Sequence, residues 1–373
     1  MYKLLKNTSI KIEDGDRGKN YPSSSDFSNF GYALFLNNKN IINNKISLEN
    51  AQYITEEKYY SLGKGVINLN DIVLTTRGTL GNCLLFDTTN NLPARINSGM
   101  VIVRPGNDFI PKFLYYLFQS NFFQNQIVEM KSGSAQPQLP IKDIQKMYIP
   151  VFAKSHQQHI VNTIGTIDDK IENNEKLINK IEEFLLLNFI KLDKCEGLVF
   201  SDIFNCFNGG TFKSSDYVEK SECKLITIKN IDGNGFNTDN ATYIPKMNKY
   251  EKYKLKIGDI LLTMTGAYLG RSGIVDEENC YLNQRVLKIS GISKSFLYCF
   301  LKYNQNEIFN LGKGSAQPNL SLSDLNCFPV NYDINDINSF CENDKYIDLI
   351  INLKIKTRKL KTIKAQFLTK FFN

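Results

Sequence analysis

Few residues of this chain have the types and spacing that catalysis requires. His156 and His159 are the only two histidines among the 373 residues, so a mechanism with a histidine base has almost nothing to use. Their spacing places both on one face of a helix near its start, but no third metal ligand stands nearby, and a zinc site needs at least three. We interpret the pair as residues at a helix start and expect no metal in this chain.

Other catalytic motifs are also missing. An adenine methyltransferase needs a cofactor-cradling glycine loop and a motif containing Pro-Pro, and the chain has no Pro-Pro pair. No phosphate-binding loop of the GxxxxGK[ST] type occurs, which argues against ATP hydrolysis. Asp168-Asp169-Lys170 has the residue types of a nuclease site, but it falls in a helical segment, where a solvated face explains it. The sequence predicts a protein that is not an enzyme.

Composition sets the broad class. With 42% hydrophobic residues, the chain is long enough for two packed domains of ordinary size. No apolar run approaches the length of about 18 residues that spans a membrane, and the N-terminal residues lack a signal-peptide pattern, so we expect a cytoplasmic location and no membrane partner. The eight cysteines form no CxxC pair and are interpreted as reduced thiols.

The net charge of +7 is not spread over the chain. Residues 349–373 alone carry seven basic residues and no acidic one, and the rest is nearly balanced. A protein that binds any polyanion needs many phosphate contacts over its surface. DNA binding, if present, must therefore come from particular loops or from help by partners.

An internal repeat is the main signal. Ser134-Ala135-Gln136-Pro137 returns as Ser315-Ala316-Gln317-Pro318, and the run 71–82 matches 259–271 with one residue inserted. Asn97 and Asn283 each precede an apolar run, and a helix is predicted in both copies, over 111–128 and 294–310. The offsets drift only from 188 to 181, so we infer that a whole domain is duplicated. The alternative is two unrelated α+β domains.

A long helix with a coiled-coil seam is predicted after each copy. In the first, apolar residues alternate at spacings of four and three, interrupted by one polar residue that can fix the register. The seam of the second helix is weaker. The seam positions are Ile160, Ile164, Ile167, Ile171, Asn174, Ile178, Ile181 and Leu185 in the first helix and Leu353, Leu360 and Phe367 in the second.

The two helices carry complementary charge. Residues 157–192 hold six acidic residues against four lysines, whereas the second helix ends almost purely basic. Opposite charge favours pairing of the two helices with each other, although an ordinary core helix and a solvated basic tail remain alternatives. A helix of about 34 residues is about 50 Å long and could span half-sites one DNA turn, about 34 Å, apart.

This organisation resembles the specificity subunits of Type I restriction–modification systems along essentially the whole chain. GDRGKNYP at 15–22, LTTRGTLGN at 74–82 and RINSGMV at 95–101 look like one class of target-recognition domain. Gly209-Gly210-Thr211 resembles the opening of such a domain, QQHIV at 157–161 the start of the central helix, and GSAQPQL the loop before it. The second helix departs from the pattern because it lacks a Gln-Gln start, which puts the symmetry of the two partner contacts in doubt.

The resemblance implies a role without catalysis. Each recognition domain would read one half of an asymmetric, bipartite site in double-stranded DNA. The paired helices would set the length of the spacer between the half-sites and bind two methyltransferase subunits. Methylation, ATP-driven translocation and cleavage would belong to methyltransferase and restriction subunits, with S-adenosylmethionine, ATP and Mg held there and no cofactor in this chain. The alternatives are a coiled-coil scaffold and a silent specificity-like protein without partners of its own.

Polar side chains on the predicted loops are the candidate DNA contacts, because base edges present donors and acceptors that they can match. Each has a structural alternative, since glycine-rich turns need polar residues and Arg95 can brace the following strand. Gln136 and Gln317 are identical in two domains that should read different sequences, so we assign them a phosphate-contacting or structural role. The candidates are Arg17, Lys19, Asn20, Tyr21, Arg77, Thr79 and Arg95 in the first copy and Thr211, Lys213, Ser214, Ser215, Thr265, Tyr268, Arg271, Gln284 and Arg285 in the second.

The sequence therefore predicts an α+β protein with two similar globular recognition domains, each followed by a long helix, and the two helices pairing as an antiparallel coiled coil. The predicted divisions are 1–153 for the first domain, 154–192 for the central helix, 193–333 for the second domain and 334–373 for the C-terminal helix.

Overall fold

The computed structural model describes residues 1–42, 44–87, 93–133, 137–233, 235–314 and 318–373. The chain forms two compact units. The first unit consists of Met1–Asp169 and Lys361–Asn373, and the second of Lys170–Leu360. Each unit thus contains one globular domain and a part of both long helices, whereas the sequence suggested domains and helices as four successive segments.

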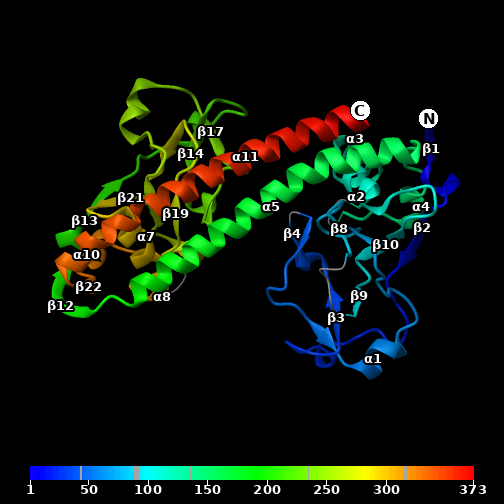
Figure 1. Ribbon diagram of the computed structural model, residues 1–373, viewed down its shortest axis with the longest axis horizontal. Coiled ribbons are helices and arrows are strands. Elements are labelled where there is room, and N and C mark those ends of the chain that lie inside the picture. Colours follow the sequence, from blue (N-terminus) through cyan, green and yellow to red (C-terminus); the bar gives the residue numbers. More distant parts are fainter. Residues whose placement is uncertain (43, 88–92, 134–136, 234, 315–317) are drawn as a thin grey trace. The chain divides into compact units, whose positions relative to one another are not determined.

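The first unit is built on an antiparallel sheet in the order β2-β10-β7-β8, beside a smaller sheet in the order β6-β3-β9, in which β3 and β9 run parallel. Two further pairs, β1 with β11 and β4 with β5, complete the strands (Figure 1). The strands are β1 (Tyr2–Leu4), β2 (Lys11–Asp14), β3 (Ala33–Leu36), β4 (Ile41–Ile42), β5 (Lys45–Ile46), β6 (Tyr53–Ile54), β7 (Ile72–Thr75), β8 (Cys83–Leu85), β9 (Ala94–Ile96), β10 (Met100–Arg104) and β11 (Tyr148–Pro150).

The second unit repeats this plan sheet by sheet. Its orders are β13-β21-β18-β19 and β17-β14-β20, with β14 and β20 parallel, and its pairs are β12 with β22 and β15 with β16. The predicted duplication is confirmed. The strands are β12 (Lys194–Val199), β13 (Phe204–Asn208), β14 (Cys223–Ile226), β15 (Ile231–Asp232), β16 (Gly235–Phe236), β17 (Thr242–Ile244), β18 (Ile260–Thr263), β19 (Ser272–Ile274), β20 (Cys280–Leu282), β21 (Val286–Gly291) and β22 (Pro329–Tyr332).

Short helices cover the main sheet of each unit. The single helices predicted over 111–128 and 294–310 are wrong in one respect, because each is two helices. Ser120 ends the first and caps the second with its side chain, which accepts from the N–H of Phe123, and Asn304 stands at the corresponding break. The helices are α1 (Glu56–Ser61), α2 (Pro111–Gln119), α3 (Asn121–Met130), α4 (Ile141–Ile144), α6 (Phe200–Ile203), α7 (Lys294–Tyr303), α8 (Gln305–Asn310) and α9 (Leu322–Asn326).

Two long helical segments follow the domains. The central helix α5 (Lys154–Ile190) begins and ends close to its predicted bounds. The C-terminal segment predicted as one helix over 334–373 is interrupted, because α10 (Ile334–Phe340) ends in a 3-10 turn at Cys341–Asn343 before α11 (Asp344–Phe372) begins.

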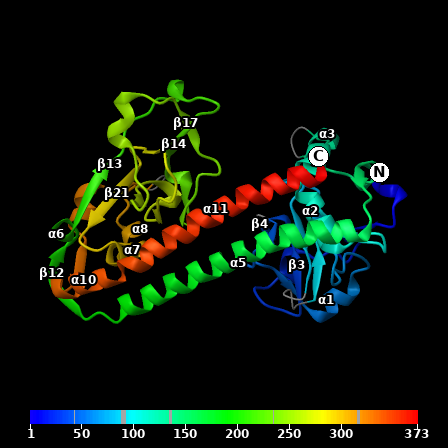
Figure 2. The same cartoon turned by 45° about the horizontal axis from the view of Figure 1, so that its top comes forward.

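The long helices pair in both units (Figures 1 and 2). In the first unit, Ile160 and Ile164 share a core with Leu368 and Phe372 at the end of α11. Lys364 also pairs with Asp168 at 2.8 Å. The start of α5 therefore lies against the end of α11.

In the second unit the end of α5 lies against the start of α11. Ile178, Ile181 and Leu185 share a core with Ile347 and Leu353, near the start of α11. Within it, Asn174 donates to the Thr357 hydroxyl at 3.1 Å. The pairing is therefore antiparallel, as predicted.

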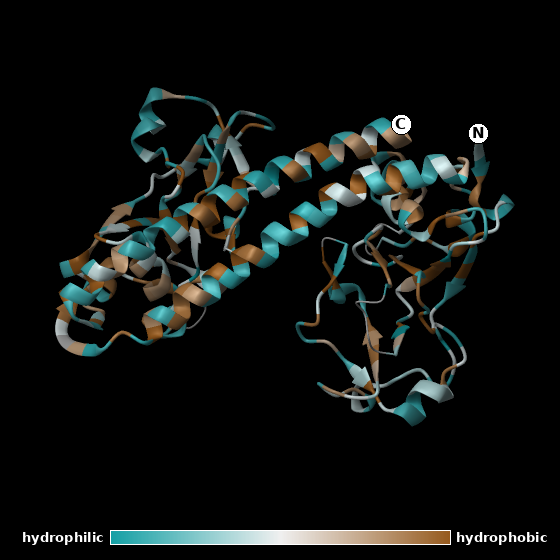
Figure 3. Ribbon diagram, viewed as in Figure 1, coloured by the Kyte–Doolittle hydropathy of each residue, from teal (hydrophilic) through white to brown (hydrophobic). Residues whose placement is uncertain are grey.

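Burial follows the predicted seam. Figure 3 shows apolar residues recurring along both helices between polar ones. The seam isoleucines and leucines of α5 are at most 9% exposed, from Ile160 to Leu185, and Leu353 is 7% exposed, whereas Asn174, Leu360 and Phe367 are half-buried. Because the seam is filled from within the chain, any contact of the helices with another subunit falls to their exposed faces.

A polar side chain near the start of each following helix anchors it to the domain before it. In the first unit, Gln157 is buried, accepts from the N–H of Ile110 at 2.8 Å and donates to the Asp108 carbonyl at 2.8 Å. In the second unit, the Asp344 carboxylate accepts from the N–H of Ser295 at 2.8 Å, and from the hydroxyls of Ser293 and Ser295 at 2.9 and 2.7 Å. Asp344 thus holds the start of α7 as Gln157 holds the start of α2. This accounts for the absence of a Gln-Gln pair at the start of the second long helix.

Candidate nucleic-acid interface

The first candidate surface lies where the loop after β2 crosses the turn before β10. A Cβ atom on Gly15 would stand 2.3 Å from the Asn97 carbonyl oxygen, so only glycine permits this approach. Arg17 donates to the Ser98 carbonyl at 3.3 Å and pairs with Asp14 at 3.1 Å, and the Tyr21 hydroxyl accepts from the N–H of Ser98 at 3.4 Å. Arg17 and Tyr21 therefore meet at this turn.

Asp16 fixes the same loop. Its carboxylate accepts from the N–H of Gly18 and of Gly63, both at 2.6 Å. These backbone hydrogen bonds, with the positive charge of Arg95 beyond them, lower the pKa of Asp16 below its usual range. The loop that carries Arg17 is thus held by an ionised carboxylate.

The end of β7 contributes the second part of this surface. Arg77 is half-buried and forms an isolated bridge with Gln138, while Gly78, with φ of +69°, donates to the Pro137 carbonyl at 3.2 Å. The Asn38 side chain donates to the Arg77 carbonyl, and its own carbonyl oxygen is buried without a partner among the described residues. Thr79 is exposed next to them.

The second unit repeats these contacts with other residues. A Cβ atom on Gly209 would stand 2.2 Å from the Asn283 carbonyl oxygen, as Gly15 does from Asn97. Thr265 forms the bridge with Asn319, and Gly266 donates to the Pro318 carbonyl at 2.8 Å. By these contacts Arg77 corresponds to Thr265 and Gln138 to Asn319.

The turns correspond in the same way. The N–H of Thr76 donates to the Gly99 carbonyl at 2.8 Å, and the N–H of Met264 donates to the Arg285 carbonyl at 3.1 Å. Gly99 thus corresponds to Arg285, and Ser98 to Gln284. Arg77, just after β7, stands where the second unit has Thr265, and Arg285, just before β21, stands where the first unit has Gly99.

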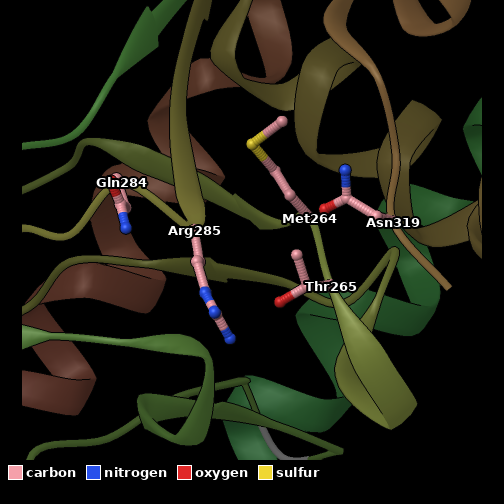
Figure 4. A pocket seen from close by; sticks show the side chains of 5 residues that line it. All are labelled: Met264, Thr265, Gln284, Arg285 and Asn319. Carbon is pink, nitrogen blue, oxygen red and sulfur yellow. The ribbon is translucent and has the colours of Figure 1, made fainter. Parts of the chain in front are cut away.

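In the second unit the junction encloses a hollow of about 380 Å³, lined by Met264, Thr265, Gln284, Arg285 and Asn319. Figure 4 shows the polar ends of Arg285 and Thr265 directed toward the same open space. Arg285 and Gln284 are exposed, while Thr265 is only 8% exposed and its hydroxyl has no hydrogen-bond partner in the described part of the chain. Three of the nine predicted residues of this copy therefore gather at one site.

Thr211 joins this group from the loop after β13. Its hydroxyl donates to the side-chain carbonyl of Gln284 at 2.8 Å. The Gln284 amide nitrogen is thereby left as the free, donating end of the side chain.

The remaining candidates lie apart from the hollow or in supporting positions. Lys19 in the first unit and Lys213, Ser214 and Ser215 in the second are exposed, and Asn20 donates to the Ser61 carbonyl at 3.0 Å. Arg271 stacks on the ring of Tyr268 at 4.9 Å. None of these seven residues lines the hollow.

Arg95 is placed differently from an exposed DNA contact. It is 4% exposed, donates to the Lys64 carbonyl at 2.6 Å and lies over the ring of Tyr59 at 4.5 Å. Burial also lowers the pKa of its guanidinium. This position fits the bracing alternative, and a DNA contact by Arg95 stays an untested prediction.

Residues at these junctions that were not predicted include Asn38, Gln138, Met264 and Asn319. Asn319 stands directly after the repeated SAQP string, in the position of Gln138, so the repeat itself was the signal. Nothing in the sequence near Asn38 marks it, because its partner Arg77 lies 39 positions away. Gln136 and Gln317 lie outside the described residues.

Other site types find little support. Among the residues that the structure describes, no group of three or more His, Cys, Asp and Glu side chains is placed to hold a metal ion. Among the described residues, none of the eight cysteines lies in a disulfide. In the described part of the chain no helix combines the length and apolar character needed to cross a membrane.

Comparison with known proteins agrees with the duplication. The family described as "Type I restriction modification DNA specificity domain" matches the chain twice, at residues 11–183 and 199–333. Among curated proteins, the chain is 24% identical over 304 residues to the Type I restriction enzyme MjaIX specificity subunit of Methanocaldococcus jannaschii, covering 73% of this chain and 69% of that protein. It is 23% identical to the MjaVIII specificity subunit of the same organism, covering 79% and 76%.

A solved structure shares the fold. The S subunit of a Type I restriction–modification system from M. genitalium superposes with a TM-score of 0.59 at 18% identity, covering all of this chain and 96% of that one. Subunits of this kind recognise DNA and carry no catalytic activity, as was predicted for this chain. With two matches that cover most of its length, the chain belongs to the Type I restriction–modification DNA specificity family.

Proposed function

We propose that this chain reads an asymmetric, bipartite DNA site, one half with each domain, and docks the subunits that modify or cut the DNA. The observation that carries the proposal is the pair of junctions with one backbone and different side chains. Arg77 and Gly99 stand in the first unit where Thr265 and Arg285 stand in the second. One scaffold with different polar groups suits two readers of different sequences.

The charge distribution supports reading at particular loops. The chain has 45 basic against 38 acidic residues, and much of the excess lies in the C-terminal helix. Binding that relied on phosphates alone would need basic residues spread over the surface. Localised contacts at the two junctions, assisted by partner subunits, explain selective binding better.

The partners are assigned from the family and from the absence of methyltransferase and ATP-hydrolysis motifs in the sequence. We propose that two methyltransferase subunits and the restriction subunits supply methylation and cleavage, with S-adenosylmethionine, ATP and Mg bound in those subunits. The exposed faces of α5 and α11 are available for docking because the seam between them is filled within the chain.

The long helices would set the distance between the half-sites. At about 1.5 Å per residue, the 37 residues of α5 measure about 55 Å. One turn of DNA separates half-sites by about 34 Å. Insertion of one seven-residue helical repeat near Asn174, with a matching insertion near Thr357, should lengthen the preferred spacer. An unchanged spacer in the methylated sites would contradict this role.

The function is tested by mapping methylated adenine genome-wide in two hosts. Both carry the neighbouring methyltransferase gene, and only one carries this chain. A bipartite motif that appears with the chain and is absent without it supports the proposal and identifies both half-sites. Methylation that does not change with the chain contradicts it, and favours a silent protein or a coiled-coil scaffold.

A further inference from the structure

The hollow in the second unit has the features of a site built for a ligand. Thr265 lines it and is more than nine-tenths buried, and its hydroxyl has no hydrogen-bond partner among the residues that the structure describes. A buried polar group without a partner costs free energy, of the order of 1–3 kcal/mol, unless something binds it. Thr265 therefore points to a polar ligand that enters the hollow.

The hollow offers hydrogen-bond donors. The Arg285 guanidinium carries five N–H groups, and no acidic side chain pairs with it among the described residues. Thr211 occupies the carbonyl end of Gln284 at 2.8 Å, so Gln284 presents its NH₂ group. The ligand that fits is one with closely spaced acceptors.

Among base pairs in the major groove, guanine presents two adjacent acceptors, N7 and O6, and arginine binds both with its parallel N–H groups. A phosphate also accepts hydrogen bonds, but exposed basic residues can bind it without a recess. The recessed Thr265 hydroxyl and the oriented Gln284 amide favour a flat, edge-on ligand. The chemistry of the hollow thus favours a base edge over the DNA backbone.

We propose that the hollow binds the major-groove edge of a guanine in the second half-site. Arg285 reads N7 and O6, the Thr265 hydroxyl and the Gln284 amide contact the neighbouring base or an ordered water, and Thr211 is a positioning residue that holds Gln284. This inference rests on the proposed function and adds to it the identity of one base pair and of the residue that reads it.

The test uses the complete chain assembled with its methyltransferase partner. The variants are Arg285→Ala and Arg285→Lys, with Lys220→Ala as the matched control, because Lys220 is exposed and lies outside the hollow. Methylated sites are mapped genome-wide, and binding is measured with duplexes in which each base pair of the second half-site is changed in turn.

The proposal predicts a G·C pair in the second half-site whose preference depends on Arg285. Loss of one bidentate pair should reduce discrimination at that position by roughly 5- to 150-fold for Arg285→Ala. The discrimination by Arg285→Lys should fall between that of the unaltered chain and that of Arg285→Ala, because lysine keeps the charge without the paired N–H geometry. The first half-site should keep its full specificity in both variants, which also shows that the variant chain has folded and assembled. Lys220→Ala should match the unaltered chain.

Thr211 gives an independent readout. Thr211→Val should relax the preference beside the guanine while the preference for guanine itself is kept, and Thr211→Ser should restore the original pattern. A purely structural role of Thr211 would instead weaken both positions, and serine would restore them together.

Three results overturn the proposal. Equal weakening on all sequences, with a salt dependence reduced by about one phosphate contact, would assign Arg285 to the DNA backbone. A second half-site without a G·C pair would exclude guanine as the ligand. An unchanged motif in Arg285→Ala would remove the hollow from recognition. If the unaltered chain directs no bipartite methylation, the proposed function itself fails, which the host comparison distinguishes.

Discussion

The two domains have the same sheets in the same order, yet they differ most where their loops converge. Backbone contacts at the junction repeat closely: Gly78 and Gly266 both have φ of +69° and donate to the carbonyl of the proline that follows the SAQ triplet. The side chains do not repeat: Arg77, just after β7, stands where the second unit has Thr265, and Arg285, just before β21, stands where the first unit has Gly99. This shared backbone with different side chains supports the proposal that the two domains read different sequences.

The polar contacts between α11 and the domains also differ between the two units. In the second unit, Arg358 bridges Asp276 and Glu277, and Glu277 also accepts from Lys224 at 2.5 Å. In the first unit, Lys364 contacts Asp168 at 2.8 Å and the Gln119 side chain at 3.0 Å. Asp276 is the more deeply buried of the two carboxylates that Arg358 contacts, and this burial raises the pKa of Asp276.

The largest expected effect is on stability, from Arg358→Met. Asp276 is only 5% exposed, and removal of its partner leaves a buried carboxylate, at a cost of roughly 3 kcal/mol. Lys364→Met should cost about 1 kcal/mol or less, because Asp168 keeps 27% of its side chain exposed. Urea denaturation followed by hydrogen exchange in each unit measures both. Equal losses would contradict the difference in burial.

The next effect compares the two anchors. Gln157→Ala and Asp344→Ala each leave buried donors or acceptors unpaired, and each should destabilise its own unit by about 2 kcal/mol. Hydrogen exchange should quicken at the start of α2 in the first variant and at the start of α7 in the second. Asp348→Ala is the control, because its side chain is 61% exposed. An effect that spreads equally over both units would argue against separate anchors.

Arg77→Ala sharpens the comparison of the two junctions. It should weaken discrimination in the first half-site only, by about 1–3 kcal/mol if Arg77 contacts a base. Mapping of methylated sites with this variant and with an exposed control, Lys3→Ala, measures the change. Equal loss in both half-sites would contradict the model of two separate readers.

The smallest expected effect concerns the polar pair within the seam. Replacement of both partners, Asn174→Leu with Thr357→Val, should raise the free energy of unfolding by about 1 kcal/mol or less, since buried polar pairs trade stability for register. Thermal unfolding measures the gain. A loss of stability would show that the hydrogen bond matters more than apolar packing at this position.

The sequence predicted the fold well because its signals were local or repeated. The alternation of four and three along Ile160 to Leu185 specifies a helix with one apolar face, whatever lies against it. The repeated strings placed strands and turns at corresponding positions in both copies, with a single residue inserted in the second. The breaks at Ser120 and Asn304 were missed, because a capping residue within an apolar helical pattern looks like an ordinary polar position.

The candidate site was predicted only in outline. Polar residues in glycine-rich loops were recognised from their types, and Thr265, Gln284 and Arg285 do meet. Arg95 looked equivalent to them in the sequence, yet it is buried over Tyr59, 36 positions earlier in the chain. Local periodicity carries no information on such pairings.

By itself the sequence determined the duplication, the class of each domain and the seam of the helices, because these depend on residue spacing along one segment. Only the tertiary structure decided that Asp344 replaces Gln157, that Thr265 is buried without a partner among the described residues, and that Arg77 and Arg285 stand at different positions of the corresponding junctions. The physical reason is that hydrogen bonds and burial at these sites join residues tens of positions apart, which fold topology alone brings together.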